Sequence, residues 1–169
     1  MNATLAAWNQ ADEPEALDAM LACCGSRRWA KAIVALRPIA SVEELSAAAD
    51  RLWSTMEEPD WMEAFACHPR IGKRNTQHAA LKSAAWSAQE QSSTAQAADR
   101  VLADLAAGNT LYEERYGFTY IVCATGKTAE EMLAILHRRL AGSREAELRE
   151  AAEQQRQITQ IRLGKWLVE

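Results

Sequence analysis

The chain has 169 residues, of which 49% are apolar and 25% charged, and its net charge is −4. This composition is typical of a globular protein, and the lack of a long basic stripe argues against nucleic acid as a partner. No basic segment followed by an apolar one opens the chain, and no stretch approaches the roughly 18 apolar residues of a membrane span, so we expect neither a secretory signal nor a membrane segment.

Start and stop signals divide the first part of the chain into short helices. Pro14 suits the first turn of a helix, and Gly25 is expected to end that helix in left-handed backbone. Ser41 and Glu44 form a capping box, in which each side chain accepts a free amide N–H of the helix start. The expected helices cover about residues 14–24, 26–37, 41–56 and 59–67.

The second part of the chain is also predicted to be helical. Capping boxes occur at 87–90 and 128–131, and Gly108 and Gly117 are expected to end two helices. The expected helices cover about residues 76–84, 87–107, 109–116, 128–141 and 143 to near the end. Residues 118–126, FTYIVCATG, resemble a strand, but a lone strand has no partner, so we expect an extended segment between helices.

These elements predict an all-α fold. We expect a single compact multi-helix domain over residues 1–169, with about eight or nine helices and one extended segment near 118–125. The four cysteines fit no zinc or disulfide framework, which favours reduced thiols in a cytoplasmic protein and argues against a metal site. They are Cys23, Cys24, Cys67 and Cys123.

His68 lies where a helix must stop. The residue before a proline is disfavoured in helical backbone, so Pro69 ends the helix at or before His68. The imidazole then leaves from a helix C-terminus, where it either caps the helix or transfers a proton near neutral pH. The bases that follow, Arg70, Lys73 and Arg74, could attract a small anion.

The segment WSAQEQ has two interpretations. Ser87 and Glu90 form the capping box, which is a purely structural role. The same helix N-terminus could instead bind a carboxylate or the oxygens of a polar ring through its free amides, with Gln91 beside it. The local sequence does not decide between the two.

Arg162 lies within the apolar stripe of the last helix. On a helical wheel it falls between Leu148 and Ile158, on the face that is expected to be buried. A buried arginine needs a partner, because an unpaired buried charge is very costly. That partner is either an internal carboxylate or a bound ligand with planar oxygens, which a guanidinium grips two at a time.

Extended backbone at Tyr120, Ile121 and Val122 carries amides and carbonyls that also need partners. Side chains of neighbouring helices can supply them, and so can a polar heterocycle that docks edge-on.

Four pieces in order, HPRIG, WSAQEQ, LYEERYGFTYIVCATGK and ITQIRL, resemble the family of 2-oxo-4-hydroxy-4-carboxy-5-ureidoimidazoline (OHCU) decarboxylases. The resemblance covers essentially the whole chain. It implies a compact helical homodimer that uses no metal or organic cofactor. It also implies a carboxy-lyase of urate degradation, which converts OHCU to (S)-allantoin.

The resemblance implies that His68 is the catalytic residue, and our hypothesis gives Glu90 and Arg162 catalytic roles beside it. The implied substrate-binding positions are Pro69, Ser87, Ala88, Gln89, Glu90, Gln91, Tyr120, Ile121, Val122, Cys123, Ala124 and Arg162. Relatives often carry phenylalanine where this chain has Tyr120. We expect ring stacking to survive that change, with the added hydroxyl altering the rim of the pocket.

A second hypothesis is a helical interaction module without chemistry. In that case Arg162 would pair with an internal acid such as Glu90, and no purine-like ring would bind. The C-terminal residues LVE do not form the Ser-Lys-Leu peroxisomal signal, which again favours a cytoplasmic location.

Overall fold

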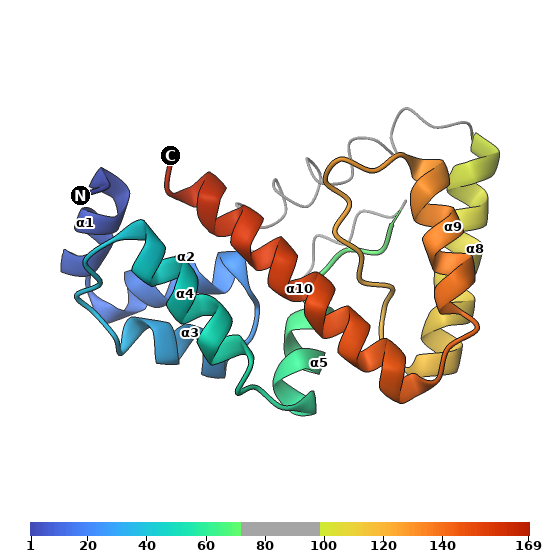
Figure 1. Ribbon diagram of the computed structural model, residues 1–169, viewed down its shortest axis with the longest axis horizontal. Coiled ribbons are helices and arrows are strands. Elements are labelled where there is room, and N and C mark those ends of the chain that lie inside the picture. Colours follow the sequence, from blue (N-terminus) through green and yellow to red (C-terminus); the bar gives the residue numbers. More distant parts are fainter. Residues whose placement is uncertain (72–98) are drawn as a thin grey trace. The chain divides into compact units, whose positions relative to one another are not determined.

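The structure is a computed structural model that describes residues 1–71 and 99–169 (Figure 1). These residues form eight helices and no strand, which confirms the all-α class for the described part of the chain. The helices are α1 (Ala3–Gln10), α2 (Glu13–Cys23), α3 (Arg27–Val34), α4 (Val42–Trp53), α5 (Glu58–Ala66), α8 (Asp99–Tyr116), α9 (Ala129–Arg139) and α10 (Arg144–Trp166). No described helix is both long and apolar enough to cross a membrane.

The described residues divide into two compact units. Unit 1 comprises Met1–Ala64 and Arg156–Glu169, and unit 2 comprises Phe65–Gln155. Helices α5 and α10 each contribute residues to both units. The single domain expected over residues 1–169 therefore stays a prediction. The helix predicted at 76–84 and the capping box at 87–90 lie outside the described residues.

Helix α2 of unit 1 begins as predicted but ends differently. Asp12 accepts the N–H of Glu15 at 2.9 Å, and Pro14 lies in the first turn. At the other end the fully buried Cys24 leaves the helix in extended backbone, with φ −149° and ψ 121°. The left-handed stop predicted at Gly25 is therefore wrong, because the chain turns toward the core one residue earlier.

The capping box at the start of α4 forms with one change of partner. Ser41 Oγ accepts the N–H of Glu44 at 3.1 Å. The Glu44 carboxylate accepts the N–H of Ala40 at 2.9 Å instead of that of Ser41. Two amides are still satisfied, so the helix begins where the sequence predicts, although it ends at Trp53 rather than at the predicted Met56.

Tryptophans make up much of the core of unit 1. Trp29 is fully buried and donates its indole N–H to the carbonyl of Ala49 at 3.1 Å. Trp8 donates to the carbonyl of Ala16 at 3.0 Å, and its ring meets that of Trp166 edge-on at 6.1 Å. Because the indole N–H groups of Trp8 and Trp29 have acceptors, these two rings are buried without an unsatisfied donor.

Unit 2 has one long helix where the sequence predicted two. Helix α8 continues through Gly108 and Asn109, so the stop predicted at Gly108 is wrong. A side chain at Gly108 would place its Cβ 2.6 Å from Cδ2 of Leu136 in α9. The glycine allows α8 and α9 to approach closely, which is a packing role rather than a terminating one. The stop predicted at Gly117 is confirmed, with φ 84°.

Both ends of α9 are satisfied by side chains. Thr128 and Glu131 form the complete predicted capping box, with hydrogen bonds of 3.1 and 3.2 Å. At the other end the Tyr116 hydroxyl lies 2.7 to 3.1 Å from the carbonyl oxygens of Arg139, Leu140 and Gly142. The hydroxyl carries one proton, so it donates to one of these carbonyls at a time at this end of the helix.

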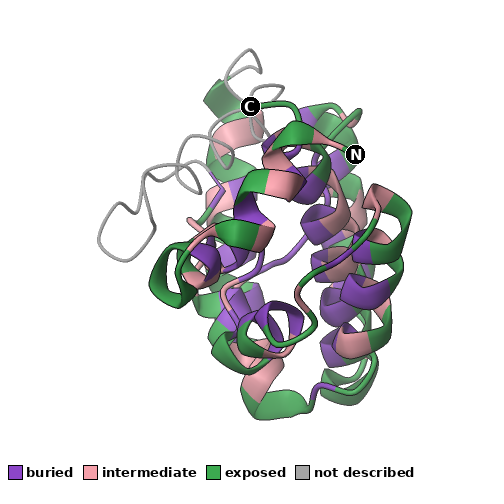
Figure 2. Cartoon of the chain, turned by 90° about the vertical axis from the view of Figure 1, so that its left-hand side faces the viewer, coloured by how far each residue is buried: buried purple, intermediate pink, exposed green. Residues whose placement is uncertain are grey.

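Residues 117–128 join α8 to α9 without regular secondary structure, as predicted for 118–125 (Figure 1). From 118 to 124 the residues are buried, apart from the half-buried Thr119. Figure 2 shows that burial in this protein extends beyond the helices to irregular chain. The backbone groups of this segment must therefore find partners away from water.

Candidate active site

His68 follows the end of α5 and contacts α10. The helix ends at Ala66, as Pro69 requires, and His68 and Pro69 are half-buried. The Nε2 atom of His68 lies 2.6 Å from the side-chain oxygen of Gln155, a fully buried residue. Because an amide oxygen only accepts, this contact requires the proton of the neutral ring to be on Nε2.

Arg70, two residues after His68, is paired with an acid. Its Nη2 lies 2.6 Å from Oε2 of Glu113 in α8. The idea that Arg70 attracts a small anion is therefore not supported, since a carboxylate already occupies that position. Lys73 and Arg74 lie outside the described residues.

The segment from Tyr120 to Ala124 is held by side chains from three helices. Its first N–H, that of Tyr120, donates to Oδ1 of Asn109 in α8 at 2.9 Å. The carbonyl of Ile121 accepts from Nη1 of Arg139 in α9 at 2.5 Å. The N–H of Cys123 donates to Oε1 of Gln154 in α10 at 2.8 Å. Helix side chains thus supply partners for the N–H groups of Tyr120 and Cys123 and for the C=O of Ile121.

Val122 lies between the last two of these hydrogen bonds. Among the described residues its own N–H and C=O make no hydrogen bond, although Val122 is only 8% exposed. The sequence predicts extended backbone here, in which the N–H and C=O of one residue point to the same side and the flanking C=O and N–H point to the opposite side. In that conformation Val122 offers an adjacent donor and acceptor on the edge that Arg139 and Gln154 do not occupy.

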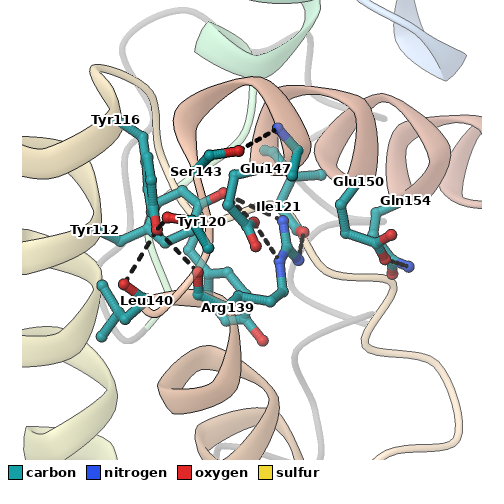
Figure 3. Close-up of polar contacts among 12 residues, drawn as sticks. Tyr112, Tyr116, Tyr120, Ile121, Arg139, Leu140, Ser143, Glu147, Glu150 and Gln154 are labelled. Atoms are coloured by element: carbon teal, nitrogen blue, oxygen red, sulfur yellow. Dashed lines mark hydrogen bonds and ion pairs between the residues drawn. The ribbon is translucent and has the colours of Figure 1, made fainter.

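Arg139 is the centre of a buried polar cluster (Figure 3). Its Nε donates to Oε2 of Glu147 in α10 at 2.8 Å, and its Nη2 donates to the hydroxyl of Tyr112 at 3.2 Å. That hydroxyl in turn donates to Glu147 at 2.8 Å. The guanidinium lies 5.6 Å from the ring centre of Tyr112 and 5.0 Å from that of Tyr120, so it also makes cation–π contacts.

Burial shifts the pKa values within this cluster. Burial raises the pKa of Tyr112 well above its ordinary 10.0, and the Arg139 charge only partly opposes the rise. The pKa of Tyr120 is raised for the same reason. Burial by itself would lower the pKa of Arg139, but Tyr112 and Glu147 outweigh it and raise that pKa. Both tyrosines therefore stay neutral, and the arginine stays charged, near neutral pH.

The hydroxyl of Tyr120 does not lie where the sequence suggested. It donates to the carbonyl of Met132 in α9 at 2.9 Å, and the residue is 4% exposed. The expectation that this hydroxyl alters the rim of a pocket is not met, because the ring packs inward against Tyr112 and Arg139.

Unit 2 brings two of the predicted pieces together. The rings of Phe65, near the end of α5, and Phe118, at the start of the irregular segment, lie 5.4 Å apart. Consecutive glutamines of α10 contact both pieces, Gln154 through the N–H of Cys123 and Gln155 through His68. His68 and the Tyr120-to-Ala124 segment therefore border the same stretch of α10.

The remaining predicted site residues cannot be joined to these two pieces. Ser87, Ala88, Gln89, Glu90 and Gln91 lie outside the described residues. Arg162 belongs to unit 1 and is 3% exposed, as the apolar stripe predicted. The convergence of His68, Glu90 and Arg162 on one pocket stays a prediction.

Sequence reasoning missed Arg139, Gln154 and Gln155. One signal could have suggested part of this set, because Glu147, Glu150 and Gln154 follow a spacing of i, i+3 and i+7, which places them on one face of α10. Nothing in the sequence near Arg139 indicates that its charge is buried.

The OHCU decarboxylase family model matches residues 9–164. The chain is 38% identical over 146 residues to the uric acid degradation bifunctional protein TTL of Arabidopsis thaliana, a match that covers 85% of this chain but only 44% of that protein. It is 28% identical over 134 residues to the 2-oxo-4-hydroxy-4-carboxy-5-ureidoimidazoline decarboxylase of Amia calva, covering 79% of this chain and 77% of that protein.

Solved structures agree with this match. The structure of an OHCU decarboxylase in the presence of (S)-allantoin has a TM-score of 0.77 at 32% identity, and the match covers 90% of this chain and 99% of that one. The structure of an (S)-allantoin synthase has a TM-score of 0.70 at 20% identity and shares the fold. Because the family model matches residues 9–164, which is most of the chain, the chain belongs to the OHCU decarboxylase family.

Proposed function

We propose that the chain is a carboxy-lyase that converts OHCU to (S)-allantoin and CO₂ in urate degradation. The observation that carries the proposal is the OHCU decarboxylase match over residues 9–164. The likeness to a decarboxylase solved in the presence of (S)-allantoin supports it, since that match covers nearly all of the solved chain.

The substrate itself explains why positioned side chains suffice for this reaction. OHCU carries a carboxylate and a hydroxyl on one ring carbon, next to a C=N bond that bears a ureido group. When the bond to the carboxylate breaks, its electron pair forms a C=C bond to the neighbouring carbon, and the C=N pair moves to the nitrogen, which takes up a proton. The hydroxyl then loses its proton and becomes a carbonyl, while a proton is added to one face of the neighbouring carbon, which sets the handedness of allantoin.

His68 is the proposed acid–base residue. Its contact with Gln155 favours a ring protonated at Nε2, and an imidazole can both donate and accept a proton, which suits transfer of the hydroxyl or carboxylate proton. The free edge of Val122 supports a role for the 120–124 segment in binding the ring, because a lactam or urea edge carries a matching donor and acceptor. Glu90 would hold ureido or ring N–H groups, and Arg162 would clamp a carbonyl oxygen.

Replacing His68 tests the catalytic assignment. We expect His68→Asn to reduce stereoselective turnover by about 100-fold to 10,000-fold, since a positioned acid–base group typically contributes that much. The measurement adds freshly generated substrate and follows the optical signal of the (S) product against spontaneous racemic decay. Far-UV circular dichroism should stay unchanged.

The exposed His137 of α9 offers a matched control, and His137→Asn should retain the wild-type rate. If His68→Asn also converts substrate at the wild-type rate, the assignment of His68 is wrong. If the wild-type chain forms racemic allantoin no faster than the spontaneous reaction, the proposed function itself is wrong and the interaction module is favoured.

We also propose a cytoplasmic homodimer. The family resemblance supports the dimer, and the reduced thiols support a reducing compartment, since three of the four cysteines are buried as thiols. Sedimentation velocity of the full chain tests the dimer, and a single species at the mass of one 18.7 kDa chain would refute it.

A further inference from the structure

Two hydrogen bonds hold one edge of the 120–124 segment. They flank Val122, whose backbone N–H and C=O make no hydrogen bond within the described part of the chain. We infer that Arg139 and Gln154, which make these two bonds, are positioning residues that fix the orientation of the Val122 edge toward the substrate ring. The inference rests on the proposed function and deepens it. As positioning residues, Arg139 and Gln154 do not touch a reacting atom.

The amide of Gln154 is oriented by a neighbour on the same helix. Its Nε2 donates to Oε1 of Glu150, one turn earlier in α10, at 3.0 Å. With the amide nitrogen directed at a carboxylate, the amide oxygen is left to accept the N–H of Cys123 at 2.8 Å. Glu150 thus decides which end of Gln154 faces the segment.

Arg139 is held even more firmly. Glu147 and Tyr112 fix the guanidinium at its Nε and Nη2 atoms, and Nη1 remains to donate to the carbonyl of Ile121 (Figure 3). The side chains of Arg139 and Glu147 are 5% and 7% exposed, so water does not compete strongly for these bonds. A buried donor thus lies on one side of Val122 and a half-buried acceptor, oriented by Glu150, on the other.

This arrangement fits a planar ring that carries an N–H and a C=O side by side, as a lactam or a cyclic urea does. Two parallel hydrogen bonds to one residue demand a fixed direction for both backbone groups. If either bond beside Val122 were lost, the edge could rotate and both ligand bonds would weaken together. Such a loss should affect binding more than the chemical step.

The test removes the acceptor at position 154 while leaving the volume nearly unchanged. We expect Gln154→Met to raise the KM for OHCU, and the dissociation constant of (S)-allantoin, by about threefold to tenfold, as the loss of one hydrogen bond implies. The kcat should change less than the KM. The amide hydrogen of Cys123, followed by NMR in the ligand-free chain, should exchange faster.

A double variant tests whether the hydrogen-bond acceptor at position 154 is what matters, and not the glutamine side chain as such. Glu150→Gln combined with Gln154→Glu exchanges the two side chains, keeps the net charge, and keeps an oxygen facing the Cys123 N–H. We expect this variant to recover most of the wild-type KM. The matched control is Gln160→Met, which removes another hydrogen-bonded glutamine of α10 and should leave the KM unchanged.

The outcomes separate the inference from the proposed function. If the wild-type chain neither forms (S)-allantoin selectively nor binds it, the proposed function fails and this inference fails with it. If the wild-type chain is active but Gln154→Met lowers only the melting temperature, with KM and allantoin affinity unchanged, the inference alone is overturned. The inference alone is also overturned if the double variant Glu150→Gln, Gln154→Glu has the same raised KM as Gln154→Met.

Discussion

Each unit contains an arginine paired with an acid from another helix, and the two pairs differ mainly in burial. In unit 2 the side chains of Arg139 and Glu147 are 5% and 7% exposed. In unit 1 those of Arg156 and Asp50 are 35% and 42% exposed, with Nη1 and Oδ2 3.1 Å apart. Water can therefore replace either partner of the second pair, but it cannot replace a partner of the first.

The two pairs also serve different parts of the backbone. Arg139 donates to the carbonyl of Ile121 in an irregular segment, which lacks the regular backbone hydrogen bonds of a helix or a sheet. Asp50 accepts from Gln160 as well as from Arg156, and so connects two regular helices, α4 and α10, within unit 1. The comparison indicates that the buried pair maintains a local conformation, whereas the half-exposed pair adds to packing that already exists.

Breaking the buried pair should have the largest effect on stability. We expect Arg139→Met to lower the free energy of unfolding by about 3 to 5 kcal/mol, because Glu147 is left as an uncompensated buried charge. Urea denaturation followed by circular dichroism measures this loss.

The double variant Arg139→Met, Glu147→Leu should recover part of the loss, since no lone charge remains. Equal losses in the single and double variants would show that the charge of Glu147 is not the cause.

Alkaline pH should weaken the same cluster. Tyr112 and Tyr120 have pKa values raised above 10.0 in the folded chain, so their contribution to stability is complete below pH 10 and is lost as pH rises further. We expect the free energy of unfolding to fall by about 1.4 kcal/mol per pH unit for each of the two tyrosines. Urea denaturation at pH 9, 10 and 11 measures the slope.

Tyr120→Phe should remove about half of that slope. A stability that stays constant from pH 9 to pH 11 would contradict the burial of the two hydroxyls.

Breaking the half-exposed pair should have the smallest effect. We expect Asp50→Asn to cost about 1 kcal/mol or less, because exposed ion pairs contribute little and the new amide can still hydrogen-bond Gln160. The change should shrink further in 1 M salt, where surface charges are screened. A loss as large as that of Arg139→Met would show that burial does not separate the two pairs.

Helix starts were predictable where the signal is local. A cap such as Thr128 with Glu131 involves residues three positions apart, so the pattern alone determines the hydrogen bonds. The end of α5 before Pro69 follows from the covalent geometry of proline, and this placed His68 correctly at a helix terminus. The interruption predicted at Gly108 failed because the role of that glycine depends on Leu136, which is remote in the chain.

By itself the sequence determined the helical class of the described chain, most helix starts, the burial of Arg162 and the family. These depend on periodicity, local hydrogen bonding and the order of short motifs. Only the tertiary structure decided which side chains hold the 120–124 segment and that Gln155 contacts His68. The physical reason is that an irregular buried segment must find hydrogen-bond partners wherever the packed helices supply them, and sequence spacing does not encode that proximity.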